Sequence, residues 1–398
     1  VTGVQTCALP ISHFIDLVSI NFQEKNMKLS TSKTELQSAL QKLSKATPTR
    51  STLPILSSVL FDVQENNTVL RTTDLEITII VNLPTSIEKP GSIAIPLQTL
   101  QDITNELPED ARITLSADEN NKIEIITEVG SYNIMGKPSE EFPAIPEVDN
   151  RKSTGVSVDA LKDMISKTAF AVSRDELKPA LTGVLFRFGK KELTAVATDG
   201  HRLVRYTRSD YSADEFSGDV IVPRKFLSML SGVLGEGESI QMWMGDNHMT
   251  AAIGEDTYFT RIIDERFPDF ESVIPKDNDR ELSVNQNVLL SAARRVSIFS
   301  NKSTHQIALR LTKNKIELTT EDPEKASKAQ EKIYGEFSGD DLVIGYNASY
   351  LKDILSHIDN ETVIIKLKTS ISAALFYPGT QGENSNLTML LMPIRLND

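Results

Sequence analysis

Four short landmarks recur three times along this chain at a nearly constant spacing, and this repetition constrains the fold more than any other feature. The first is a leucine in a helix-like stretch: Leu36, Leu161 and Leu289, which stand 125 and 128 residues apart (161 − 36 and 289 − 161). The last is an apolar residue followed by proline: Phe142-Pro143, Phe267-Pro268 and Met392-Pro393, with both steps equal to 125 residues (268 − 143 and 393 − 268). A period this long is that of a whole domain with its own core rather than of a solenoid unit.

Two further landmarks fall between these in every copy. A strand-like run ends each time in a polar pair, at Thr72-Thr73-Asp74, Ala197-Thr198-Asp199 and Thr319-Thr320-Glu321. A second helix follows an apolar strand and is entered through Ile95-Pro96, Val222-Pro223 and Tyr346-Asn347-Ala348-Ser349. Proline at a first helical turn and Asn or Ser at a cap are common helix starts.

The repeat predicts the fold class and the domain boundaries. Two helices and many short, hairpin-connected strands per copy indicate an α+β domain, with the helices on one face of antiparallel sheets. We expect domains at 27–149, 150–276 and 277–398. Residues 1–26 fall outside the pattern, and we interpret Met27 as the natural start, with Val1–Asn26 a non-native or disordered extension; a genuine disordered extension is the alternative.

Composition narrows the class of protein. The single cysteine, Cys7, excludes an internal disulfide framework and a multi-cysteine zinc site, and with no apolar run long enough to span a bilayer it favours a cytoplasmic protein. The formal net charge is −13. An acidic total is not the usual footprint of a nucleic-acid binder, but a basic face can be hidden within it.

The stretch Asp199-Gly200-His201-Arg202 resembles an acid–base site at first sight. The repeat favours another interpretation, because the other two copies carry the same Thr-Asp or Thr-Glu pair without a histidine. We therefore interpret Thr-Asp as a turn that caps the strand and expect no catalytic site. The chain has no phosphate-loop motif, and His201, His248 and His305 are far apart in sequence, so we expect no metal or cofactor.

From Met27 onward the chain resembles the beta subunit of bacterial DNA polymerase III, the beta sliding clamp family. The resemblance covers all three copies in the family's order. It rests on Leu53-Pro54-Ile55-Leu56, Thr73-Asp74-Leu75-Glu76, Val196-Ala197-Thr198-Asp199-Gly200-His201-Arg202-Leu203, Ile221-Val222-Pro223-Arg224-Lys225, Arg266-Phe267-Pro268-Asp269 and Met392-Pro393-Ile394-Arg395-Leu396.

The resemblance implies a processivity factor that encircles double-stranded DNA. Its fold would be a head-to-tail homodimer, a closed ring of six similar domains with sheets outside and two helices per domain lining the hole. Partners would be the replicative polymerase, an ATP-driven clamp loader and other proteins that carry a clamp-binding peptide with Leu and an aromatic residue. The dimer interface would join Tyr132 and Ile134 to Ile298 and Phe299; ordinary core packing is the alternative for these residues.

The resemblance also implies a peptide-binding pocket with an apolar socket and a polar edge. Its residues would be Lys178, Leu181, Thr198, Gly200, His201, Arg202, Leu203, Pro268, Val273, Asn347, Tyr350, Met392, Pro393, Ile394, Arg395 and Leu396. This chain departs from the family at Lys178 and Ser272, where many members carry Arg, and at Asn397-Asp398, which extend past the usual end. The polar edge of the pocket is therefore expected to differ, and the socket is not.

Basic residues would line the hole and contact phosphates without sequence preference. The resemblance places Arg50, Arg174, Lys178, Arg224 and Lys225 near DNA. The helical stretches add Lys33, Lys42, Lys45, Lys162, Lys167, Arg294, Arg295, Lys302 and Lys352. For any one of them a solvated helix face is the alternative.

Two other classes stay open on the sequence alone. One is an enzyme that uses Asp199 and His201. The other is a triplicated binding protein that never closes into a ring, or a clamp-like paralogue.

Overall fold

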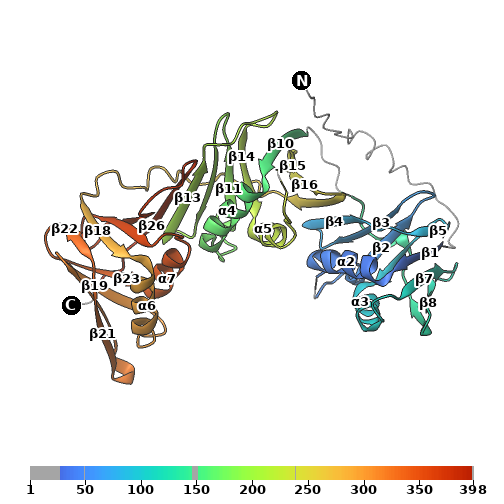
Figure 1. Ribbon diagram of the computed structural model, residues 1–398, viewed down its shortest axis with the longest axis horizontal. Helices are drawn as coiled ribbons and strands as arrows, with labels where there is room; N and C mark the ends of the chain where they lie inside the picture. Colours follow the sequence, from blue (N-terminus) through green and yellow to red (C-terminus); the bar gives the residue numbers. More distant parts are fainter. Residues whose placement is uncertain (1–26, 49, 146–150, 238, 397–398) are drawn as a thin grey trace. The chain divides into compact units, whose positions relative to one another are not determined.

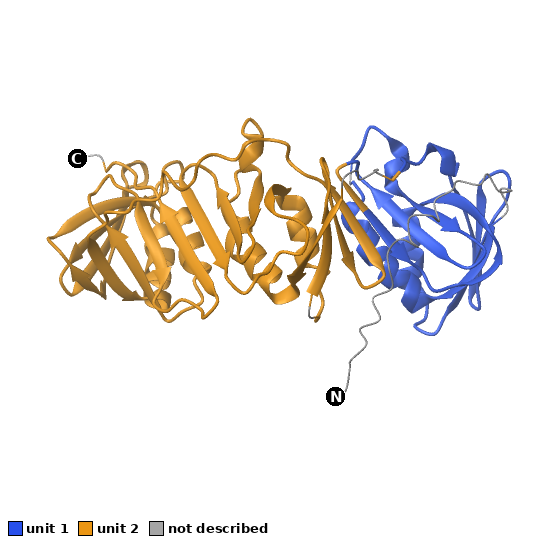
Figure 2. Ribbon diagram, turned by 90° about the horizontal axis from the view of Figure 1, so that it is seen from above, with its two compact units in different colours: residues 1–75, 79–144 blue, residues 76–78, 145–398 orange. Residues whose placement is uncertain are grey.

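The computed structural model describes residues 27–48, 50–145, 151–237 and 239–396 (Figure 1). The chain divides into two compact units: unit 1 comprises Val1–Leu75 and Ile79–Ala144, and unit 2 comprises Glu76–Thr78 and Ile145–Asp398 (Figure 2). The expected extension 1–26, the expected boundary at 149–150 and Asn397-Asp398 lie outside the described residues.

Each repeat contributes two α-helices to the described chain. They are α2 (Lys33–Leu43) and α3 (Leu97–Glu106) in unit 1, and α4 (Val158–Thr168), α5 (Arg224–Ser231), α6 (Gln286–Ser297) and α7 (Ala348–Ser356) in unit 2. Short 3-10 turns accompany them: η1 (Ser44–Ala46), η2 (Pro54–Ser57), η3 (Ser139–Glu141), η4 (Ala169–Ala171), η5 (Pro179–Leu181) and η6 (Pro323–Lys325). The two helices of each repeat pack against each other.

The first helix of every repeat begins at a side-chain cap. The caps are Ser32, Ser157 and Asn285, whose side-chain oxygens accept from the backbone N–H three residues on, at 3.2, 3.4 and 3.1 Å. Each cap satisfies a donor that the first turn of the helix would otherwise leave free. The second helices of the first two repeats instead follow Pro96 and Pro223, which stand just before the first helical residue rather than within the first turn.

Unit 1 is built from antiparallel strands. They are β1 (Met27–Ser32), β2 (Ser58–Val63), β3 (Thr68–Thr73), β4 (Ile77–Asn82), β5 (Ser86–Lys89), β6 (Gly91–Pro96), β7 (Arg112–Ala117), β8 (Lys122–Thr127) and β9 (Gly130–Met135). Five of them form a sheet in the order β5-β1-β7-β8-β9, so β9 is an edge strand; β4, β3, β2 and β6 are neighbours in that order.

Unit 2 continues the pattern with two repeats. Its first strands are β10 (Lys152–Ser157), β11 (Gly183–Phe188), β12 (Leu193–Thr198), β13 (Arg202–Arg208), β14 (Gly218–Pro223), β15 (Ser239–Met244), β16 (His248–Ile253) and β17 (Asp256–Arg261). The remainder are β18 (Arg280–Asn285), β19 (Gln306–Thr312), β20 (Lys315–Asp322), β21 (Ser327–Tyr334), β22 (Glu336–Ser338), β23 (Leu342–Asn347), β24 (Thr362–Leu367), β25 (Ala374–Pro378) and β26 (Ser385–Leu391).

A nine-stranded sheet joins the two repeats of unit 2, in the order β14-β11-β12-β13-β26-β25-β24-β18-β22. The junction is the antiparallel pair β13–β26, in register from Arg202 opposite Leu391 to Arg208 opposite Ser385. This pairing explains why the second and third repeats form one compact unit. A separate sheet, β21-β20-β19-β23, leaves β21 at its edge.

Helices and sheets are segregated as expected for the α+β class. Figure 1 shows α4 and α5 together below β11, β13 and β14, and α6 beside α7. Helix α4 packs on β12 and β13, and α6 packs on β19 and β20. The predicted α+β fold with two helices per repeat and antiparallel sheets is confirmed. In the part of the chain that the structure describes, no helix is long and apolar enough to cross a membrane.

Candidate functional site

A tight turn between β12 and β13 organises the stretch that the sequence singled out. Thr198 Oγ1 donates to the Arg202 carbonyl at 2.6 Å and accepts from the Gly200 N–H at 3.1 Å. Asp199 Oδ1 accepts from the N–H groups of His201 (2.9 Å) and Arg202 (3.1 Å). Gly200 has φ +90°, a conformation that a residue without Cβ adopts readily. Asp199 is thus occupied as the turn's acceptor rather than placed as a base.

The same turn recurs in the first repeat but not in the third. In the first, Thr73 Oγ1 accepts from the Leu75 N–H at 3.0 Å, and Leu75 takes φ +76° at the position of Gly200. In the third, β20 runs on to Asp322, so Thr320 and Glu321 lie inside a strand. The expectation that all three pairs end a strand is therefore wrong for the third copy, because β21 pairs with β20 along its whole length and keeps it extended.

Arg202 is buried and all sides of its guanidinium are engaged. Nε donates to Asp199 Oδ2 at 3.0 Å, one terminal nitrogen to Asp353 Oδ2 at 2.6 Å and the other to the Phe170 carbonyl at 2.9 Å. The rings of Phe170 and Tyr350 lie 5.2 and 4.7 Å from its central carbon. Arg202 therefore fixes the β12–β13 turn against helix α7. The exposed His201 stacks on Tyr350, with ring centroids 5.8 Å apart.

The C-terminal segment lies beside this turn. The Met392 N–H donates to the His201 carbonyl at 2.8 Å, and the Ile394 N–H donates to the Gly345 carbonyl on β23 at 2.9 Å. A Cβ on Gly345 would come within 2.6 Å of Leu396 and 2.8 Å of the Ile394 carbonyl, so only glycine lets the segment approach so closely.

Helix α7 contacts the same turn through Tyr350. Asn347 Oδ1 accepts from the N–H groups of Ser349 and Tyr350 at 2.9 and 3.4 Å, so Asn347 acts as the helix cap. The cap fixes the start of α7 and with it Tyr350, which is the residue that contacts His201 and Arg202.

An apolar cluster, which we call the floor, lies beside the turn and the C-terminal segment, on the sheet face that carries Leu203 and Leu390. Its core is the buried cluster Leu185, Val196, Leu203, Ile221, Phe270, Leu375 and Leu390, and partly buried Ala180, Ile263, Phe267, Ile274, Ala373 and Tyr377 pack against it. The segment 262–275 thus crosses this sheet face. Val273 on this segment is 56% exposed, and Met392 on the C-terminal segment is 42% exposed. We call the arrangement of floor, turn and C-terminal segment the junction groove.

Other expected pocket residues border the junction groove. Leu181 is buried next to Ala180, and its carbonyl accepts from the Ser173 N–H at 2.8 Å. Lys178, Pro268 and Arg395 are exposed. Most residues of the expected pocket therefore lie on segments that meet at one junction of unit 2, and their role in peptide binding stays a prediction.

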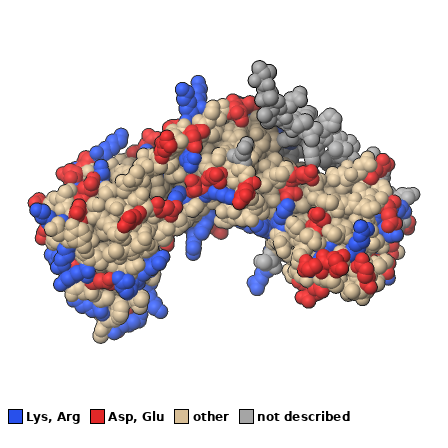
Figure 3. Space-filling model, in the orientation of Figure 1, with Lys and Arg blue, Asp and Glu red and all other residues tan. Residues whose placement is uncertain are grey.

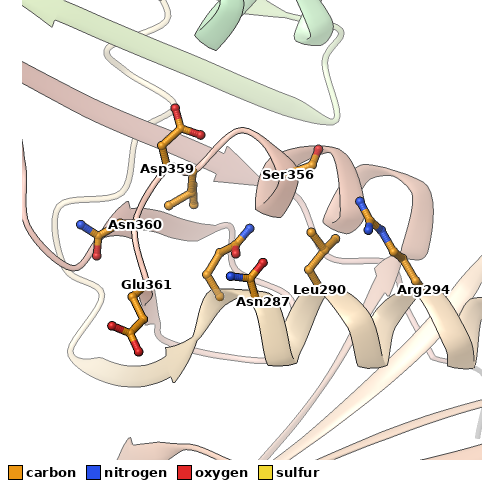
Figure 4. Close-up of a pocket in the computed structure, with 9 residues that line it drawn as sticks. Asn287, Leu290, Arg294, Ser356, Asp359, Asn360 and Glu361 are labelled. Atoms are coloured by element: carbon orange, nitrogen blue, oxygen red, sulfur yellow. The ribbon is translucent and has the colours of Figure 1, made fainter.

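A separate cavity of about 590 Å³ lies elsewhere in unit 2, beside the ends of α6 and α7 (Figure 4). Its lining is polar and includes Asn287, Arg294, Asp359 and Asn360. None of the expected peptide-binding residues lines it, and Asp359 is already paired with Lys167. Nor does any group of three or more His, Cys, Asp or Glu among the described residues have the geometry to hold a metal ion.

The structure buries two residues of the expected basic lining and pairs a third with an acidic side chain. Lys33 is 2% exposed and its Nζ lies 2.6 Å from Glu109. Lys167 is 8% exposed and pairs with Asp359, while Arg295 pairs with Glu331. Because Lys33 is buried against Glu109, and Lys167 is buried and reaches Asp359 of the third repeat, the expectation that they face a phosphate backbone is wrong. Arg295 stays exposed, but its charge is compensated by Glu331.

The other basic residues are at the surface. Arg50, Arg174, Lys178 and Lys225 are exposed, and Arg224 is half-buried. Figure 3 shows Lys and Arg side chains gathered on the side of unit 2 where its helices lie. These residues stay a prediction as DNA contacts.

The residues expected at a dimer interface lie on or beside edge strands. Tyr132 and Ile134 are partly buried on β9. Ile298 caps the end of α6 and is 76% exposed, and Phe299 is 43% exposed. The Phe299 carbonyl accepts from Ser327 Oγ on β21 at 3.3 Å, which places Phe299 beside that edge strand.

Sequence reasoning missed several residues that shape the groove. Asp353 and Phe170 hold Arg202, and Arg187 holds the segment 262–275 by pairing with Glu271 at 3.3 Å and lying 5.1 Å over the Phe270 ring. Hydrogen bonding to Asp219 raises the pKa of Arg187 further. The partners of Arg202 are 151 and 32 residues away in sequence, so no local pattern could have found them.

Comparison with known proteins matches the three repeats in order. Residues 27–146 match the N-terminal domain of the DNA polymerase III beta subunit, residues 155–269 its central domain and residues 271–395 its C-terminal domain. The beta sliding clamp of Pseudomonas putida is 32% identical over 373 residues, which cover 93% of this chain and 100% of that relative.

Solved structures show the same likeness. The DNA polymerase III beta subunit from Pseudomonas aeruginosa superposes with a TM-score of 0.88 at 30% identity, and the C. crescentus beta sliding clamp with PEG bound has a TM-score of 0.88 at 28% identity. Each covers 93% of this chain and 100% of the other. The repeated fold is that of a sliding clamp of DNA replication. The chain belongs to the family of bacterial DNA polymerase III beta subunits.

Proposed function

We propose that two copies of this chain close head to tail into a ring around duplex DNA, and that the junction groove binds a short peptide of the polymerase and of other partners. On this proposal the chain is an accessory subunit of the polymerase without a catalytic site of its own, and it works in the cytoplasm. Its domains run over 27–149, 150–276 and 277–398.

The observation that best supports a ring is that two edge strands, β9 and β21, carry or adjoin apolar side chains. Strand β9 ends the sheet of unit 1 and carries Tyr132 and Ile134, and β21 ends a sheet of unit 2 beside Ile298 and Phe299. An unpaired edge with exposed apolar side chains invites pairing with another chain. If β9 of one copy pairs with β21 of another, the contact joins two different surfaces and is therefore heterologous. Such a contact gives a closed ring when the rotation that relates neighbouring copies adds up to a full turn.

The junction groove supports peptide binding in the same way. An apolar floor with a few fixed polar groups at its rim suits an inserted Leu or aromatic side chain. The rim is rigid, because Arg202, Asn347 and Gly345 fix the turn, α7 and the C-terminal segment. A short peptide gives modest affinity with fast exchange, and a ring that stays on DNA raises the partner's effective concentration.

Contacts to DNA would be to phosphates only. Exposed Arg174 and Lys178 on the loop before η5, with Arg224 and Lys225 at the start of α5, supply cations without a base-stacking platform. Weak contacts are enough if the ring cannot leave sideways.

The test is retention on DNA. The protein is loaded on nicked circular plasmid by a clamp loader, half of the sample is linearised by one cut, and both are washed at high salt. We expect retention on the circle and loss from the linear form, because salt removes phosphate contacts but not topology. Equal loss from both would refute the ring and leave a triplicated binding protein.

A variant isolates the interface. Ile298→Asp places a charge in the expected seam at a position that is already exposed in the single chain. It should keep the fold, sediment as a monomer and lose retention on the circle. Unchanged dimer mass would refute this seam.

A further inference from the structure

Arg205 on β13 has a buried nitrogen without a hydrogen-bond partner. Its Nε is buried and finds no acceptor, whereas Arg205 as a whole is only half-buried. Among the described residues its one hydrogen bond is to Thr388 Oγ1 and is long, at 3.4 Å. Within the described chain it takes part in no ion pair. Buried guanidinium N–H groups are normally satisfied, so an arginine left in this state calls for an acceptor that comes from elsewhere.

Arg205 lies at the end of the groove floor. Leu203 belongs to the floor, and Arg205 stands two residues further along β13, on the same face of the sheet. Across the sheet, Arg205 is opposite Thr388 on β26, and Tyr377 on β25 packs its ring against the floor cluster. The charge of Arg205 also acts on the Tyr377 hydroxyl, so the two side chains are close.

The neighbouring charges do not compensate Arg205. On the same sheet face Arg187 is paired with Asp219 and Glu271. Lys366 lies with its Nζ 6.0 Å from the Tyr377 ring centroid, and Glu281 stands opposite Lys366 across β18–β24. Asp219 and Glu271 are therefore matched to Arg187, and none of the ion pairs among the described residues of this face includes Arg205.

Tyr377 supplies a second donor. Its hydroxyl makes no hydrogen bond with any residue that the structure describes, and burial raises the pKa of the Tyr377 hydroxyl, so the phenol is protonated at neutral pH. An anchored phenol O–H and a planar guanidinium that share one acceptor form a good receptor for a carboxylate.

We propose that Arg205 and Tyr377 form a carboxylate-binding end of the junction groove, which selects peptides that carry a carboxylate next to their apolar residues. The carboxylate is either the peptide's C-terminus or an Asp or Glu side chain. This inference rests on the peptide-binding function proposed above and adds its specificity.

The experiment compares peptide pairs on the full-length protein by fluorescence anisotropy. One labelled decapeptide ends in a segment with Leu and Phe and is made as free acid and as C-terminal amide. A second pair, both amides, carries Asp or Asn beside the Phe. We expect at least one carboxylate form to bind about tenfold more tightly than its neutral twin, as one charge-assisted hydrogen-bond pair gives. The pair that shows the difference identifies the source of the carboxylate.

Variants assign the effect to the two residues. Arg205→Leu should bring the affinity ratio of the twins to about one, and Tyr377→Phe should reduce it about threefold. Lys191→Gln, which removes the same charge at the exposed β11–β12 turn, should leave the ratio as it is. A ratio is insensitive to loss of folded protein, because both twins meet the same sample.

The outcomes separate the inference from the function on which it rests. Equal binding of the twins by the unaltered protein, or a tenfold ratio that survives Arg205→Leu, overturns the carboxylate site and leaves peptide binding intact. Failure of all four peptides to bind overturns the groove itself, and the inference falls with it.

Discussion

Replacing Arg202 with alanine tests whether this residue holds the groove or touches the peptide. Its guanidinium donates to Asp199, Asp353 and the Phe170 carbonyl and lies between the rings of Phe170 and Tyr350. With every side engaged, the structure gives it a positioning role. Arg202→Ala should therefore lower stability as well as peptide affinity.

The expected loss of stability follows from the exposure of the two carboxylates that pair with Arg202, those of Asp199 and Asp353. Asp199 is 13% exposed, and removing one partner of a buried pair costs about 3–5 kcal/mol. Two backbone N–H groups still reach Asp199, which argues for the lower end of that range. Asp353 is 48% exposed, so its loss adds under about 1 kcal/mol. We expect about 3 kcal/mol, or a Tm for unit 2 lower by about 6–12 °C.

The assay is urea unfolding followed by circular dichroism, with peptide affinity measured on the same samples. His201→Ala is the matched control, because it removes an exposed neighbour on the same turn and should cost under about 1 kcal/mol. The reasoning would be refuted if Arg202→Ala kept its stability within about 1 kcal/mol of the parent while peptide binding disappeared. The guanidinium would then serve the peptide directly.

Three further outcomes are expected. Arg208 holds the pKa of Asp210 below its usual value by hydrogen bonding, so the pair stabilises the fold above about pH 4 and this contribution is lost as the pH falls through the lowered pKa. Asp210→Asn should cost under about 1 kcal/mol at pH 7 and progressively less below about pH 4 in urea titrations. Gly345→Ala should push the C-terminal segment off β23 and weaken peptide binding several-fold with a stability loss of about 1 kcal/mol, whereas unchanged affinity would disprove that the segment forms a wall. Lys33→Met should leave salt-dependent DNA retention unchanged, because Lys33 is buried against Glu109, whereas Arg174→Gln should weaken it.

Much of the fold could be predicted because it is written in local signals that repeat. The caps Ser32, Ser157 and Asn285 start the first helices, and their spacings of 125 and 128 residues (157 − 32 and 285 − 157) copy those of the leucines. A Thr-Asp turn needs only its own side chains, so Asp199 could be assigned to it without knowledge of distant partners.

The rest depends on contacts between residues distant in sequence. Lys33 and Lys167 have the sequence appearance of exposed helix cations, yet acceptors 76 and 192 residues away let them be buried. In the sequence, Arg205 has no feature that distinguishes it from other strand residues. Only the structure, in which β13 pairs with β26, shows that its Nε is buried without an acceptor. Periodicity reports which face a residue is on, and it says nothing of what lies opposite.

The apolar-proline landmark shows how one repeated signal acquires different roles, and this difference can be tested. In unit 1, Phe142 is 6% exposed within a cluster of Ile55, Leu56, Leu60 and Ala94, and the Arg71 guanidinium lies 5.2 Å over its ring. Its counterpart Met392 is 42% exposed at the rim of the junction groove. Phe142→Ala should therefore cost about 3–5 kcal/mol and Met392→Ala under about 1 kcal/mol, while only the latter weakens peptide binding. Equal stability losses in urea unfolding would mean that Phe142 and Met392 are core residues to the same degree. The groove would then have to be formed by the junction of the second and third repeats without a contribution from Met392.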